Sequence, residues 1–219
     1  MANRKFLTEA ETLELYRVSL DNVERQPEIA AAMADRGYEA DTINQGKSLL
    51  ANAMQLFETN RIEDDETSAA YAAYSVAKEN LENTYGVHRK LAKVVFKNDG
   101  LVMDRLSILG GIPKAYTAWL GKVKTFYSEL NKDPSLQTKL ERLKVSVEEI
   151  QEALNQIGVL EAARSEYLRE KGESQKTTKS KDDALEEIDD YMSDFYAVAK
   201  VALASEPQLL ESMGKLVKS

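Results

Sequence analysis

The sequence contains no cysteine and a single histidine, His88, among its 219 residues. The lack of cysteine excludes disulfide bonds, thiolate metal sites, iron–sulfur clusters and cysteine nucleophiles. One histidine cannot supply a zinc or di-iron site that needs several imidazoles from the same chain. We therefore expect no catalytic residue, no metal ligand and no cofactor, and a protein that is not an enzyme.

Long apolar runs are also missing. No segment approaches the roughly 20 apolar residues of a membrane-spanning helix, and the first ten residues lack the apolar core of a signal peptide. We therefore expect a cytoplasmic protein with no membrane partner. Acidic residues outnumber basic ones, 37 to 29, which gives a net charge of −8 and disfavours a nucleic-acid partner.

Helix breakers are scarce as well. Only four prolines and ten glycines interrupt stretches rich in alanine, leucine, glutamate and lysine, which are residues that lose little side-chain freedom in a helix. Strand-like alternation is not sustained anywhere, so the pattern predicts an all-α fold. After the helix start at Asp133 and Pro134, an apolar seam follows in alternating steps of four and three: Leu136, Leu140, Leu143, Val147, Ile150, Leu154 and Ile157.

An offset of about 107 residues relates the two parts of the chain. It carries Pro27 to Pro134, Ile43 to Ile150, and most of the apolar seam onto apolar residues. Few residues are identical at this offset, so the matched seam and the matched helix breakers carry the argument. We infer an internal pseudo-repeat.

The predicted architecture is an up-down helical bundle built from two tandem pseudo-repeated helical hairpin halves, residues 1–110 and 113–219, within one domain of residues 1–219. A polar connection at 170–181 has nothing apolar to bury and is expected to be the most mobile segment. The expected helices cover about 5–25, 28–58, 66–97, 99–109, 113–131, 134–169, 182–204 and 206–217.

A wide aromatic stripe marks the helix expected at 113–131, and it includes Tyr116, Trp119 and Phe126. Such width suits a deeply buried helix, or a helix that faces its own core on one side and a partner on the other. Of these two interpretations, the buried core is preferred. Trp119 is the residue expected to anchor an interface, because tryptophan is common among binding hot spots.

His88 shares the seam of the helix expected at 66–97 with Tyr85, and the offset pairs it with Phe195. An imidazole beside a tyrosine can act as an acid or a base near neutral pH. Its place on an apolar seam, however, favours a structural histidine held by a hydrogen bond.

Two charged segments have both a plain and a specific interpretation. The basic stretch 89–97 is typical of a solvated helix end, or alternatively of a phosphate-binding patch. The acidic run 182–195 is typical of a solvated helix start, or alternatively of a calcium or magnesium site. The plain interpretation is preferred for both.

Two functions agree with these observations. The first is a non-enzymatic helical interaction or scaffold module, whose partner is another protein or a second copy of the chain. The alternative is a small-ligand or cation-binding helical bundle with an interior cleft near His88. A polar pocket at His88 would favour the second, and an apolar surface at Trp119 the first. The candidate contacts are His88, Tyr85, Tyr116, Trp119 and Phe126.

Overall fold

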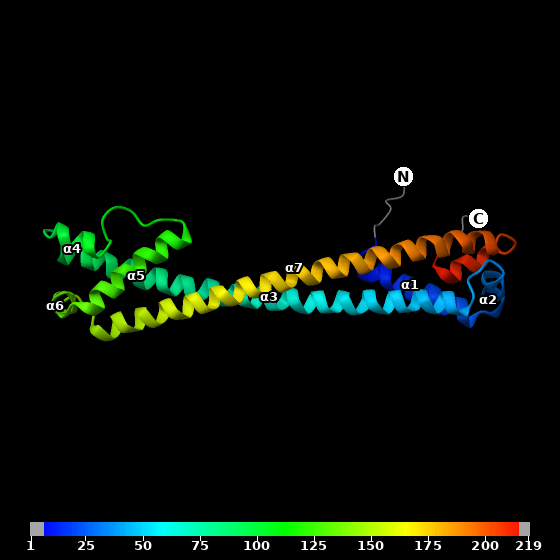
Figure 1. Cartoon of the computed structure of the whole chain (residues 1–219), viewed down its shortest axis with the longest axis horizontal. Helices are drawn as coiled ribbons and strands as arrows, with labels where there is room; N and C mark the ends of the chain where they lie inside the picture. Colours follow the sequence, from blue (N-terminus) through cyan, green and yellow to red (C-terminus); the bar gives the residue numbers. More distant parts are fainter. Residues whose placement is uncertain (1–6, 215–219) are drawn as a thin grey trace. The chain divides into compact units, whose positions relative to one another are not determined.

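The computed structural model describes residues 7–214, and within them the fold is all-α, as predicted (Figure 1). No helix in this part of the chain combines the length and the hydrophobicity that a membrane span requires. In chain order the helices are α1 Glu9–Arg25, α2 Pro27–Ala34, α3 Ala40–Val95, α4 Gly100–Arg105, α5 Tyr116–Lys132, α6 Pro134–Glu141, α7 Val147–Ala202 and the short 3-10 helix η1 Pro207–Met213.

The chain divides into two compact units, and each has its own hydrophobic core. Unit 1 comprises Met1–Asp65 and Gly172–Ser219, and unit 2 comprises Glu66–Lys171. Because α3 and α7 contribute to both units, each unit combines segments from both of the predicted halves, 1–110 and 113–219. Whether the whole chain unfolds as one domain stays a prediction.

In unit 1, α1, α2 and η1 lie against the start of α3 and the end of α7 (Figure 1). Helix α1 begins at a capping box, in which the Thr8 side chain accepts from the N–H of Glu11 and the Glu11 carboxylate accepts from the N–H of Thr8. The core includes Leu13, Leu20, Val23, Ile29, Met33, Ile43, Leu50, Ile188, Met192, Phe195 and Met213.

In unit 2, α4, α5 and α6 lie with the end of α3 and the start of α7 (Figure 1). Helix α6 begins where the sequence predicts, because the Asp133 carboxylate accepts from the N–H groups of Ser135 and Leu136 and Pro134 occupies the first turn. The core includes Leu81, Tyr85, Phe96, Leu106, Ile108, Trp119, Phe126, Tyr127, Leu136, Leu140, Ile150, Ile157 and Leu160.

The helix break expected after residue 58 is wrong, since the chain breaks earlier, at Gly37. The φ angle of Gly37 is +90°, and the N–H groups of Gly37 and Tyr38 bond to the carbonyls of Ala34 and Met33. This left-handed cap ends α2. The second half breaks in the same way at Lys144, whose φ angle is +65°, so the helix expected at 134–169 is also divided.

The polar connection expected at 170–181 is wrong too, because these residues are helical and lie inside α7. Polar side chains join this part of α7 to α3 within unit 1. The Asn60 amide donates to the Thr178 hydroxyl at 3.2 Å, and the Ser174 hydroxyl donates to the Asp64 carboxylate at 2.7 Å. Polar side chains therefore contribute contacts between the two helices along this segment.

The helix bounds recur with an offset of 107 residues. The bounds of α1, α2 and α3 shifted by 107 are those of α5, α6 and α7. Left-handed backbone recurs as well, with Gly37 paired with Lys144 and Ser107 paired with Gly214. These matches agree with the predicted pseudo-repeat, and superposition of the two halves remains the test of it.

Candidate interaction surface

The aromatic stripe of α5 faces the core of unit 2. Trp119 is 4% exposed and Phe126 is fully buried, as is Tyr85 of α3 at 1% exposure. Tyr116 is half-buried, with the guanidinium of Arg164 lying 4.3 Å from the centre of its ring. The side chain of Trp119 therefore packs inside unit 2, which agrees with the interpretation of the stripe as part of the core.

His88 is also a core residue, 7% exposed. Its Nδ1 atom lies 3.0 Å from the hydroxyl of Tyr127, and its Nε2 atom lies 3.8 Å from a carboxylate oxygen of Glu149. Burial lowers the pKa of His88 below its ordinary value, and the charge of Glu149 opposes this change. Burial also raises the pKa of Tyr127. His88 is thus a neutral, hydrogen-bonded residue near neutral pH.

The loop between α4 and α5 is held by cations from two helices of unit 2. Nη2 of Arg89 donates to the carbonyls of Ile108 and Gly110, at 3.0 and 2.6 Å. Nζ of Lys93 lies 3.5 Å from the Gly110 carbonyl. Nζ of Lys122 on α5 lies 3.3 Å from the carbonyl of Leu109. Carbonyls outside a helix need such donors, so these bonds fix the course of the loop.

The same loop exposes apolar side chains among lysines. Leu109 and Ile112 are 44% and 47% exposed, and Lys114 follows them on the loop, also exposed. Residues 83–98 and 105–128 together contain eight basic residues and no acidic residue, and the six residues between these ranges contain Asp99 and Asp104. We define the basic loop surface as Lys93, Leu109, Ile112, Lys114 and Lys122, together with Lys90, which is exposed on α3 one helical turn before Lys93.

Sequence reasoning identified part of this surface and missed the rest. The basic stretch 89–97 was visible, but the burial of Arg89, at 8% exposure, and its bonds to the loop depend on a tertiary contact. The lack of acidic residues in 105–128 is a signal that the sequence does carry. Tyr127, which holds His88, was visible only as a residue that widens the α5 stripe.

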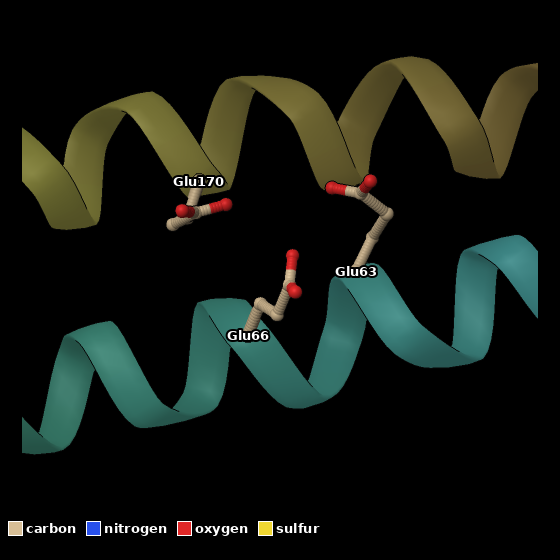
Figure 2. Close-up of side chains that lie close together, drawn as sticks. All are labelled: Glu63, Glu66 and Glu170. Carbon is tan, nitrogen blue, oxygen red and sulfur yellow. The ribbon is translucent and has the colours of Figure 1, made fainter.

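Three glutamates form the acidic cluster drawn in Figure 2, with Glu63 and Glu66 on α3 and Glu170 on α7. Glu66 and Glu170 belong to unit 2, and carboxylate oxygens of the two lie within 4.8 Å of one another. Glu170 is 6% exposed and pairs with the guanidinium of Arg169. A cationic side chain therefore pairs with the buried member of this cluster.

A cavity of about 400 Å³ lies in unit 2 between the end of α3 and α6. Two of its three charged groups already serve the fold. Asp99 accepts from the N–H of Val102 at 3.1 Å and so caps α4, and Nζ of Lys139 lies 6.0 Å from the centre of the Phe96 ring. The cavity is lined by Val95, Phe96, Asn98, Asp99, Thr138, Lys139 and Arg142.

Comparison of the chain with family models, with curated proteins and with solved structures finds no match in any of the three. Function can therefore be inferred only from the chemistry of the chain itself. Among the clusters described above, the basic loop surface combines exposed apolar groups, a single sign of charge and a backbone fixed by side chains.

Proposed function

We propose that the protein acts in the cytoplasm as a non-enzymatic helical interaction or scaffold module, and that it binds an acidic protein partner through the basic loop surface. The observation that carries the proposal is the exposure of Leu109 and Ile112 on a loop flanked by lysines. Interfaces combine an apolar centre with a polar rim in this way. Because Arg89 bonds to the loop carbonyls, less ordering is required when a partner binds.

A protein partner suits this surface better than a nucleic acid. The net charge of the chain is −8, which disfavours the many phosphate contacts that dominate nucleic-acid affinity. A folded acidic protein can instead present carboxylates to the lysines and apolar side chains to Leu109 and Ile112. Complementary charge of this kind selects the partner and speeds association.

The small-ligand alternative gains no support from the surroundings of His88. The imidazole is buried and is bonded to Tyr127, and the cavity of unit 2 described above is lined by other residues. The interaction module is therefore the only function proposed.

The test uses the full chain as bait in an extract, beside two charge-reversed variants. Lys90→Glu with Lys114→Glu changes the basic loop surface. Lys176→Glu with Lys179→Glu makes the same change of charge at exposed positions on α7, outside that surface. We expect an acidic protein to be captured by the wild type and by the Lys176/Lys179 variant, and to be lost with the Lys90/Lys114 variant. Equal capture by all three would contradict the proposal.

A further inference from the structure

Charge is distributed unequally between the two units. Unit 1 contains 23 acidic and 13 basic residues, a net charge of −10, whereas unit 2 contains 14 acidic and 16 basic residues, a net charge of +2. One chain therefore carries a strongly acidic unit and a slightly basic one. Two copies of such a chain attract each other when opposite units face, and unlike charges steer association in this way.

The acidic charge of unit 1 is concentrated on one segment of α7. Residues 182–194 contain seven acidic residues and no basic residue, and all seven are exposed because the buried stripe of Ala184, Ile188 and Met192 faces the core. Two of the seven have partners within unit 1: Asp182 lies 3.3 Å from Lys181, and Asp189 accepts from the Tyr16 hydroxyl. We call the other five the acidic α7 face: Asp183, Glu186, Glu187, Asp190 and Asp194.

We infer that the partner of the basic loop surface is a second copy of this chain, which presents its acidic α7 face. The inference rests on the proposed function and names the partner for the same surface. The argument is charge complementarity, since the basic loop surface offers four lysines and no acidic residue, and the acidic α7 face offers five carboxylates and no basic residue.

The two surfaces lie in different units, so each contact joins two different surfaces. A copy that binds through its basic loop surface keeps its acidic α7 face for a third copy, unless the same two copies pair both surfaces reciprocally and close as a dimer. Heterologous contacts of this type produce rings when they close and open chains when they do not. The assembly should therefore grow with protein concentration beyond a dimer unless it closes.

Salt is the first experimental variable, because exposed ion pairs are weak singly and are screened by salt. Sedimentation velocity of the purified full chain should show association that rises with concentration at about 0.01 M salt, where the Debye length is about 30 Å. The same samples should be monomeric at about 1 M salt, where it is about 3 Å. A wild type that stays monomeric at every concentration in low salt overturns the inference.

Charge exchange between copies is the decisive experiment. Lys90→Glu with Lys114→Glu should weaken self-association by about tenfold or more, and so should Glu187→Lys with Asp190→Lys. An equal mixture of these two variants should associate again, because each reversed surface then meets a complementary surface on the other variant. The Lys176→Glu with Lys179→Glu variant is the control and should associate at least as strongly as the wild type.

Failure of the inference is distinguishable from failure of the proposed function. If the mixture does not associate, or if the Glu187/Asp190 variant associates normally, the acidic α7 face is not the partner. In that case the proposed function alone would be supported if the wild-type bait captures an acidic protein and the Lys90/Lys114 variant does not. Co-sedimentation of the monomeric wild type with phosphatidylserine vesicles, without co-sedimentation of the Lys90/Lys114 variant, would identify a lipid partner and overturn both proposals.

Discussion

The ring of Tyr191 on α7 packs directly onto the backbone of Gly46 on α3, within unit 1. A Cβ atom at residue 46 would overlap the ring. The ring cannot move away freely, because the Tyr191 hydroxyl donates to the carbonyl of Thr42 at 2.8 Å. At the offset of 107 residues the equivalent pair is Ala153 and Thr84. Alanine, which is larger than glycine, replaces Gly46 in this pair, and threonine, which is smaller than tyrosine, replaces Tyr191.

Substitution of Gly46 tests this contact. Gly46→Ala should lower the free energy of unfolding by about 1–3 kcal/mol, because overpacking forces the ring or the backbone to shift. Gly158→Ala on α7 is the matched control, since a Cβ there meets no atom within 4 Å, and it should raise the free energy of unfolding by about 0.5–1 kcal/mol. Urea denaturation measures both. A Gly46→Ala variant as stable as the control would show that the ring does not hold this position.

The helix breaks show what the sequence could predict about the fold. Asp133 and Pro134 correctly marked the start of α6, since the cap is local. The break at Gly37 carried a signal, a glycine suited to a left-handed cap, that the apolar seam obscured. The break at Lys144 carried none, because left-handed backbone is uncommon for a lysine. Along 170–181, α7 also forms tertiary hydrogen bonds to α3 that the sequence alone does not reveal.

The candidate surface was less predictable than the fold. A wide aromatic stripe does not distinguish a core from an interface, and the structure buries Trp119. The basic loop surface forms only when the loop after α4 returns to Arg89 and Lys93 on α3. The contact between the loop and α3 depends on the packing of unit 2. Composition could therefore indicate that both segments are basic, but not that they lie side by side.

The two equivalent left-handed positions, Gly37 and Lys144, predict opposite responses to substitution. Lys144→Gly should raise the free energy of unfolding by about 0.5–1 kcal/mol. A left-handed conformation costs a non-glycine residue about 1–2 kcal/mol, which glycine avoids, but the greater flexibility of glycine in the unfolded chain offsets part of that stabilisation. Gly37→Ala should lower it by about 1 kcal/mol or more for the same reason. Thermal unfolding of both variants checks the pair, and a stabilising Gly37→Ala substitution would argue against the left-handed cap.

Burial of His88 predicts a pH dependence of stability. The folded-state pKa of His88 lies below its ordinary value of 6.5, so the unfolded chain binds the proton more readily. The contribution of His88 is therefore present above about pH 6.5 and is lost as the pH falls toward the folded-state pKa. His88→Phe, which introduces the residue found at position 195, should make stability fall less steeply with acidification. Urea midpoints across this pH range measure the difference between the two proteins, and parallel curves would refute the prediction.

Fragments decide whether the halves or the units fold on their own. Residues 1–110 contain one half, but the core of unit 1 also requires residues of 184–213, and the core of unit 2 requires residues of 119–160. Fragment 1–110 should therefore lack a sharp thermal transition and should self-associate through its exposed apolar seams. Circular dichroism and size-exclusion chromatography measure these two properties.

Fragment 66–171 is the matched comparison, because it has a similar length and keeps every buried residue of the unit 2 core. It should be monomeric, helical and cooperative in thermal unfolding, since the bonds of Arg89 to the loop and of His88 to Tyr127 lie entirely within it. Mixing fragment 1–110 with fragment 111–219 should restore helix and a sharp transition, because together they supply both cores. A monomeric fragment 1–110 with a sharp transition, beside an unfolded fragment 66–171, would show instead that the pseudo-repeat halves are the folding units.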